Sequence, residues 1–210
     1  MSSDPEAMLD SRDDLVIDVR GLGKCYHIYE RPSHRLKQGL MRGRKRYFRE
    51  FWALRGVDLQ VRPGQTVGVV GRNGSGKSTL LQMLAGTLAP TEGSVAVRGR
   101  VAALLGLGSG FNPGFTGREN VYLNAAILGL RRDEVDARLD DILSFADIGE
   151  FIDQPIRSYS SGMVVRLAFA VQAQVQPQVL IVDEALAVGD ARFQAKCFAR
   201  LKQLKQDGVA

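Results

Sequence analysis

The chain has 210 residues, of which 45% are hydrophobic, and a formal net charge of +5 at neutral pH. This length allows one domain, or one domain with a lobe inserted into it, and the hydrophobic fraction is sufficient for a buried core. Apolar runs stay well short of the roughly 18 residues of a membrane span, and the polar opening does not fit a signal peptide, so neither a membrane-spanning nor a secreted chain is expected.

The first third of the chain reads as a flexible end followed by strands. Residues 1–14 are polar, and we expect them to form a flexible N-terminus. Alternating apolar residues from Leu15 predict an early strand. Residues 51–71 predict two further strands, joined by a turn at Pro63 and Gly64.

The remainder alternates between strands and helices. A helix is expected after Lys77, then two short strands around Gly99. Helical spacing with acidic first turns predicts a helical lobe over about residues 116–176. The apolar run at 179–182 predicts a strand buried on both faces, and a last helix is expected to end near Gly208.

Cysteine usage and the charge distribution are informative. Cys25 and Cys197 lie far apart in apolar contexts without a spacing motif, which favours reduced core residues in a cytosolic protein. The positive charge is local, because residues 27–52 carry eight Lys or Arg and two Glu, a net charge of +6. This basic insertion mixes cations with aromatic residues, which favours contact with anionic lipid, a membrane partner or a pyrophosphate headgroup. A solvated insertion without a partner and a nucleic-acid contact are the alternatives.

Residues 71–79, GRNGSGKST, match the phosphate-loop pattern G-x-x-x-x-G-K-[ST]. Glycines allow backbone angles that aim successive N–H groups into one concavity, and the following helix adds its positive N-terminal end. A plain glycine turn before a helix would not explain the Lys-Ser pair. The candidate nucleotide-binding residues are Gly71, Asn73, Gly74, Ser75, Gly76, Lys77, Ser78 and Thr79. Lys77 would reach the β- and γ-phosphates, and Ser78 would hold Mg²⁺.

Two further motifs follow. Asp183 and Glu184 stand at the end of an apolar strand, where Asp183 can hold Mg²⁺ and Glu184 can polarise an attacking water as a general base. Alone, the pair could equally be solvated acids. Residues 158–170 open with serines and a glycine before a helix, which is a well-capped helix and also an anion site.

These three motifs, in this order, resemble the ATP-binding subunit of ABC transporters over about residues 15–210. YSSGM, residues 159–163, stands where the family usually has LSGGQ, and Asp190 stands where the loop after the catalytic glutamate carries its aspartate. The resemblance implies an α/β fold. It would consist of a P-loop NTPase (RecA-like) core with an antiparallel β subdomain and an inserted α-helical subdomain, of the ABC ATPase type.

The resemblance also implies site roles. It implies a homodimer with ATP and Mg²⁺ at the interface, in which the phosphate loop of one subunit faces Ser160, Ser161 and Gly162 of the other. Tyr26 matches the aromatic residue that stacks on adenine, whereas an ordinary strand tyrosine would bury its ring and bond its hydroxyl. The resemblance also implies catalytic roles for Lys77 and Glu184.

Longer segments narrow the resemblance to the polysaccharide-export branch, and residues 29–38 (YERPSHRLKQ) are most similar to O-antigen exporters. This implies export of a lipid-linked O-antigen chain across a bacterial inner membrane, with a polytopic membrane subunit as partner. The chain would then sit peripherally at the cytoplasmic face, and no nucleic-acid partner is expected.

Two departures from the family pattern qualify these expectations. Residues 105–117 contain no glutamine for the usual sensor of Mg²⁺ and the γ-phosphate, although Ser109 or Asn112 could substitute weakly. The histidines, His27 and His34, both precede the phosphate loop, so the usual switch histidine would lie beyond the last residue. We therefore expect an N-terminal fragment, without the C-terminal end of the domain, that binds ATP more readily than it hydrolyses it.

Three alternatives remain open at this point. A teichoic-acid or capsule exporter ATPase would share the mechanism but carry another polymer. A soluble ABC ATPase acting on nucleic acid or ribosomes usually joins two ATP modules or inserts a coiled coil, and neither feature is present. A nucleotide-gated scaffold would bind ATP without useful turnover.

Overall fold

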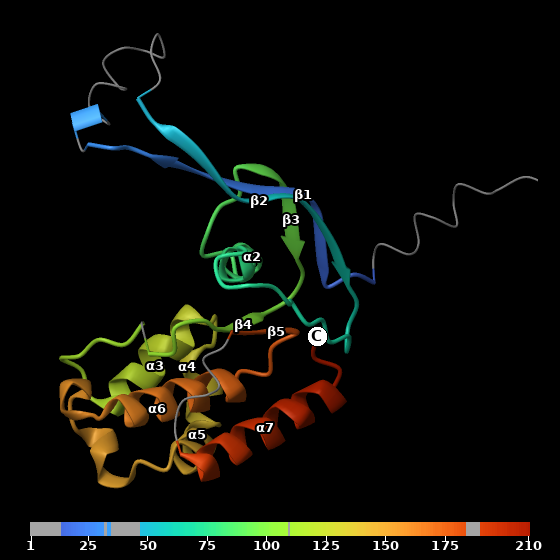
Figure 1. Ribbon diagram of the computed structural model, residues 1–210. Helices are drawn as coiled ribbons and strands as arrows, with labels where there is room; N and C mark the ends of the chain where they lie inside the picture. Colours follow the sequence, from blue (N-terminus) through green and yellow to red (C-terminus); the bar gives the residue numbers. More distant parts are fainter. Residues whose placement is uncertain (1–13, 32, 35–46, 109, 184–189) are drawn as a thin grey trace, which may run out of the picture. The chain divides into compact units, whose positions relative to one another are not determined.

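The computed structural model describes residues 14–31, 33–34, 47–108, 110–183 and 190–210. Contacts within the chain divide it into two compact units (Figure 1). The first, called the β unit, comprises residues 17–60 and 68–96. The second, called the helical unit, comprises residues 1–16, 61–67 and 97–210. The predicted helical lobe, 116–176, falls within the helical unit.

A three-stranded sheet in the order β2-β1-β3 forms the β unit. Its strands are β1 (Ile17–Ile28), β2 (Arg49–Val61) and β3 (Glu92–Val97). β1 opens with the period of two that a half-buried strand requires, because Ile17 and Val19 are buried while Arg20 is exposed. The early strand predicted from the sequence is therefore confirmed. The helix of this unit, α2 (Lys77–Leu84), buries Leu80, Met83 and Leu84.

One predicted strand is absent. The turn at Pro63 and Gly64 forms, with the Gln65 N–H donating to the Arg62 carbonyl at 3.1 Å, but residues 65–72 have no strand pairing. Val70 in this run is 96% exposed. An apolar run becomes a strand only when neighbouring strands satisfy its backbone groups. This run passes from one unit to the other at 67–68, and neither described sheet includes it.

In the helical unit, β4 (Val101–Leu104) pairs in parallel with β5 (Val179–Val182), in the register Val101 to Val179 and Leu104 to Val182. The two short strands predicted around Gly99 are thus β3 and β4. β5 forms as predicted, but it is not buried on both faces. Val179 and Ile181 are buried, whereas Leu180 and Val182 are half-buried. The side chains of Leu180 and Val182 pack against the apolar cluster that contains Phe169 and Phe193, but they are only partly covered by it.

The helical unit also contains the following described helices. They are α3 (Gly117–Ile127), α4 (Arg132–Asp136), α5 (Leu139–Ala146), the 3₁₀ turns η2 (Gly149–Asp153) and η3 (Ile156–Ser158), α6 (Ser161–Gln174) and α7 (Ala191–Gln206). Within the described ranges, no helix has both the length and the apolar character needed to cross a membrane.

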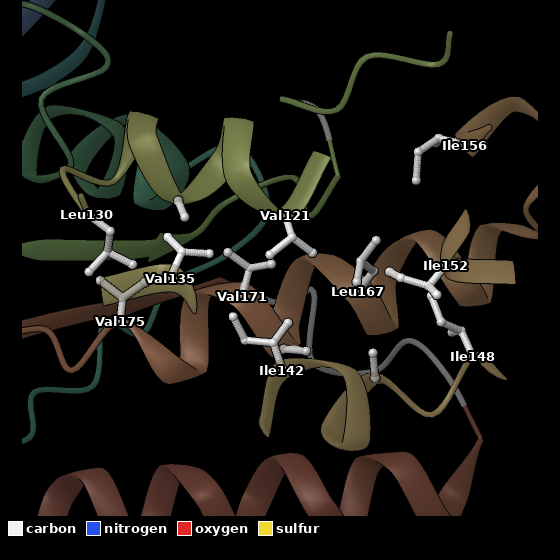
Figure 2. Packing of buried hydrophobic residues seen from close by; sticks show 13 residues of the cluster. Val121, Leu130, Val135, Ile142, Ile148, Ile152, Ile156, Leu167, Val171 and Val175 are labelled. Atoms are coloured by element: carbon white, nitrogen blue, oxygen red, sulfur yellow. The ribbon is translucent and has the colours of Figure 1, made fainter. Parts of the chain in front are cut away.

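Two apolar clusters hold the helical unit together. Figure 2 shows the larger, in which Val121 of α3, Ile142 of α5 and Leu167 and Val171 of α6 are almost fully buried. In the smaller cluster, Phe169 and Phe193 lie edge to face with ring centroids 6.0 Å apart. This cluster seats α7 on α6 through aromatic contacts, which is the packing that fixes the start of α7.

The cysteine expectation is half right. Both cysteines are free, and Cys197 is a buried core residue whose thiol pKa is raised to about 11 by burial. Cys25 is only half-buried, so it is not a core residue. An apolar sequence context does not report burial here, because β1 exposes its C-terminal end, including Tyr26 and Ile28.

The start of α3 offers a test of local stability. The Thr116 hydroxyl accepts from the Glu119 N–H at 3.1 Å, and the Glu119 carboxylate accepts from the Thr116 N–H at 2.8 Å, which is a capping box. Thr116→Ala is expected to lower the free energy of unfolding by about 1 kcal/mol, because one helix N–H loses its acceptor. Urea denaturation measures the change. Glu119→Gln, which can keep the box, serves as the control, and equal stability of wild type and Thr116→Ala would contradict the assignment.

Candidate functional site

The candidate phosphate loop, residues 71–79, leads directly into α2. The Ser75 N–H donates to the Arg72 carbonyl at 3.1 Å, which turns the chain. The Lys77 ammonium donates to the carbonyls of Gly71 at 2.9 Å and Arg72 at 3.3 Å, so the lysine folds back over the loop that precedes it. The loop residues 71–75 are exposed. The ammonium therefore lies against the backbone of an exposed loop.

Gly76 explains why this turn needs glycine. Its φ of 92° lies in the left-handed region, and it caps α2 without any side-chain hydrogen bond to the helix end. A Cβ placed on Gly76 would lie 2.6 Å from the Ala53 carbonyl oxygen and 2.7 Å from Leu54 Cδ2. The loop backbone thus lies directly against β2, which leaves no room for a larger residue.

The chemistry of this end of α2 suits an anion. The first turn of a helix presents backbone N–H groups and the positive end of the dipole, and Lys77 adds a full charge at the same place. Ser78 and Thr79 follow in the first turn, and hydroxyl oxygens are among the ligands that suit a hard cation such as Mg²⁺. The residues present therefore fit a phosphate chain with its metal.

Tyr26, the candidate for adenine stacking, lies on β1 in the same unit as the phosphate loop. Its side chain is 37% exposed, so it is not the buried strand tyrosine that was the alternative. The Lys24 ammonium lies 5.5 Å from the ring centroid. An accessible ring is what stacking requires, although its role stays a prediction.

Of the predicted acidic pair, Asp183 and Glu184, only Asp183 lies within the described residues. Asp183 directly follows β5 and is half-buried, whereas Glu184 and the rest of residues 184–189 lie outside the described ranges. Asp183 belongs to the helical unit and Lys77 to the β unit. That the two side chains meet at one Mg²⁺-bound triphosphate therefore stays a prediction.

The serine-rich motif opens α6 as the sequence predicts. Ser160 is the N-cap, and its hydroxyl accepts from the Met163 N–H at 3.2 Å. Ser160 and Ser161 are exposed, while Leu167 and Val171 further along the helix are fully buried. The motif thus offers an accessible helix N-terminus on a rigid, well-packed helix.

Tyr159 anchors the turn in front of α6. Its hydroxyl donates to the Phe151 carbonyl at 2.5 Å, and the Phe151 ring meets it edge to face with centroids 6.4 Å apart. A Cβ on Gly117 would overlap the Tyr159 hydroxyl oxygen. The Tyr159 ring therefore fits beside α3 only because the first residue of that helix, Gly117, has no side chain.

Asp190 caps α7, and its carboxylate accepts from the Phe193 N–H at 2.8 Å. This backbone hydrogen bond and the Arg166 guanidinium beside it hold the pKa of the Asp190 carboxyl below its ordinary value. The carboxylate is therefore charged at neutral pH, and its charged interactions would be lost only as the pH falls through that lowered pKa. The pairing with Arg166 was not anticipated from the sequence, because the two residues are 24 positions apart.

Asn120 makes hydrogen bonds to the loop at residues 105–117, which lacks the family's usual glutamine. The sequence analysis did not assign Asn120 a role. Asn120 is fully buried, accepts from the Asn112 N–H at 2.7 Å and donates to the Asn112 carbonyl at 3.0 Å. The Asn112 side chain is engaged within its own loop, accepting from the Gly114 N–H at 3.0 Å. Ser109, the other candidate substitute, lies outside the described residues.

The chain is similar to known proteins both in sequence and in fold. Residues 54–187 match the ABC transporter family. In fold, the chain is similar to the dimeric ATP-binding cassette MJ0796 bound to ADP and phosphate, with a TM-score of 0.71 at 23% identity over 92% of this chain and 84% of that one. At this identity the likeness concerns the fold alone.

Two curated relatives are more similar in sequence. The ABC transporter protein AbcA of Aeromonas salmonicida is 55% identical over 92% of this chain. The chain spans 62% of that relative's length, which is less than two thirds. The O-antigen export system ATP-binding protein RfbB of Klebsiella pneumoniae is 48% identical over 92% of this chain and 80% of its own length.

Proposed function

The chain belongs to the ABC transporter family, and from that premise we propose that it is the ATP-binding, ATP-hydrolysing subunit of an exporter of lipid-linked O-antigen polysaccharide. Its fold is the α/β, P-loop ATPase fold of that family. The observation that carries the proposal is the exposed loop at the N-terminus of α2, with the Lys77 ammonium folded over it. This arrangement suits the phosphates of ATP.

The proposed roles follow from the chemistry of each group. Lys77 binds the β- and γ-phosphates, and Ser78 and Asp183 hold Mg²⁺, for which hydroxyl and carboxylate oxygens are suitable ligands. When bound, Mg²⁺ supplies positive charge that offsets the negative charge of the phosphates. Glu184 takes a proton from the attacking water, and Tyr26 stacks on the adenine.

A homodimer completes the proposed site. Ser160, Ser161 and Gly162 of one subunit would face the ATP held by the phosphate loop of the other. The N-terminus of α6 is exposed, and the N–H groups of a helix N-terminus suit an anion. Asp190 would lie at the same interface. Positioning and charge, without covalent chemistry, would then stabilise the phosphoryl transition state.

The transport role rests on the relatives. RfbB is named an O-antigen export ATP-binding protein, and we propose the same cargo class for this chain. We also propose a polytopic membrane subunit as partner and a peripheral position at the cytoplasmic face of a bacterial inner membrane. A teichoic-acid or capsule exporter and a nucleotide-gated scaffold are outcomes that the following test separates.

The test uses the full-length protein expressed with its candidate membrane subunit. Co-purification and steady ATP hydrolysis are expected, and Lys77→Ala should abolish hydrolysis. Restoration of surface O-antigen in a deletion strain identifies the cargo, whereas restoration of another polymer would reassign it. Binding of ATP without turnover by the full-length protein would favour the scaffold.

The basic insertion makes a separate prediction. Its cations Arg42, Arg44, Lys45 and Arg46 lie outside the described residues, so the expectation comes from the sequence. Replacing these four with Gln is expected to impair export while ATP affinity stays within about twofold, because a polybasic segment attracts anionic headgroups. Unchanged export would end the proposal that the insertion contacts lipid, the membrane subunit or the headgroup of the cargo.

A further inference from the structure

The side chains of Lys24 and Tyr26 lie together on β1. Residues two apart project from the same face of a strand, and the Lys24 ammonium lies over the Tyr26 ring, 5.5 Å from its centroid. At this distance a cation is attracted to the negative face of an aromatic ring. Although the ammonium lies over the ring, Tyr26 keeps 37% of its surface exposed. The accessible part of the ring is the surface that a base could cover.

The Lys24 ammonium is itself held by the segment that follows α2. It donates to the Ala89 carbonyl at 2.7 Å. Thr91, in the same segment, donates its N–H to the Gly23 carbonyl at 2.9 Å, and its hydroxyl accepts from the Cys25 N–H at 3.0 Å. These hydrogen bonds hold the Lys24 side chain, and the backbone on either side of it, against one short stretch of chain.

This stretch is tied in turn to the helix that the phosphate loop opens. The phosphate loop leads into α2, and a short turn then joins α2 to Ala89. In that turn, the N–H groups of Thr87 and Leu88 both donate to the Gln82 carbonyl of α2, at 3.0 and 3.2 Å. All of these residues belong to the β unit. The anchor of Lys24 is therefore fixed relative to the proposed phosphate site within one compact unit.

We propose that Lys24 is a positioning residue for the base of the nucleotide, because its anchored ammonium holds the Tyr26 ring in the orientation that stacks on adenine. The inference rests on the proposed function and deepens it, since it assigns a second residue to the base end of the site. An exposed tyrosine without such a contact can adopt several staggered rotamers, and ordering it on binding costs free energy. A ring that is held before the nucleotide arrives avoids this cost.

The strength of the contact sets the size of the expected effect. A cation over an aromatic ring at a partly exposed site contributes a factor of about two to five to a binding constant. The hydrogen bond from Lys24 to the Ala89 carbonyl is exposed, so water can replace the ammonium there when the charge is removed. The loss is therefore expected in the affinity for the base and not in the folding of the β unit.

The test uses the full-length protein and two probes, the non-hydrolysable ATP analogue adenylyl imidodiphosphate and tripolyphosphate, which carries phosphates but no base. Lys24→Met removes the charge and keeps an unbranched side chain. It is expected to weaken binding of the analogue about two- to fivefold and to leave the inhibition constant of tripolyphosphate unchanged. Lys24→Arg keeps a cation and should recover most of the affinity. In a Tyr26→Leu background, Lys24→Met should have no further effect, because the ring through which it acts is gone.

Arg55→Met is the matched control, because Arg55 also lies over an aromatic ring of the β unit, with its guanidinium carbon 4.6 Å from the centroid of the Trp52 ring. It should bind the analogue as the wild type does. Wild-type affinity in Lys24→Met, an equal loss of tripolyphosphate binding, or a loss that persists in the Tyr26→Leu background would each overturn the inference. A wild-type protein that does not bind the analogue would instead overturn the proposed function, so the two failures are distinguishable.

Discussion

Replacing Glu184 with Gln is expected to lower kcat for ATP hydrolysis by about 10²- to 10⁴-fold while ATP binding persists. Glutamine has nearly the shape of glutamate but cannot accept the proton of the attacking water, so the dimer should form on ATP and remain closed. Single-turnover hydrolysis in the full-length protein measures the rate. Size-exclusion chromatography with ATP measures the trapped dimer.

Glu150→Gln provides the control, because Glu150 is an exposed carboxylate at the start of η2. It should hydrolyse ATP at the wild-type rate. Hydrolysis at that same rate by Glu184→Gln would show that another group activates the water, and the general-base role would be withdrawn. The proposed roles of Lys77 and Ser78 would not be affected, since they concern binding.

Replacing Gly76 with Ala should abolish ATP binding at micromolar nucleotide. The added Cβ would meet the Ala53 carbonyl oxygen at 2.6 Å, and backbone cannot move aside as a flexible side chain can. The left-handed φ of 92° adds about 1–2 kcal/mol of strain for a residue with a side chain. A combined cost of roughly 3 kcal/mol corresponds to about a 100-fold loss of affinity if the loop escapes by changing shape. Titration with a fluorescent ATP analogue measures the affinity.

Gly86→Ala separates strain from overlap. Gly86 also has a positive φ, 71°, but a Cβ there would meet nothing within 4 Å. This variant should lose about 1 kcal/mol of stability and keep its affinity for ATP. If both variants bound ATP like the wild type, the close approach of the phosphate loop to β2 would not exist in solution.

The sequence by itself determined the local parts of the site. The glycine and lysine pattern of residues 71–79 is contiguous, so its turn and the start of α2 could be predicted from residue types alone. The same holds for Ser160, which caps α6 through a neighbour three residues away. Caps, turns and helical periodicity depend on interactions within one or two turns of chain, which the sequence shows directly.

Other features depend on residues that are distant in the chain. The run before the phosphate loop is as apolar as a strand, yet Val70 is almost fully exposed because no described strand pairs with it. Cys25 has apolar neighbours in sequence but lies half-buried on β1. Burial and strand pairing are set by the elements that come to lie alongside, and a local pattern does not contain them.

The contact between Arg166 and Asp190 is another feature that a local sequence pattern does not contain. Each residue could be read locally, Asp190 as a helix cap and Arg166 as a polar position on α6, but their contact exists only because the aromatic cluster seats α7 against α6. The sequence therefore predicted which groups bind a nucleotide, and these assignments stay predictions. The tertiary structure decided which of them touch, because packing between distant helices sets the distances over which charges and hydrogen bonds act.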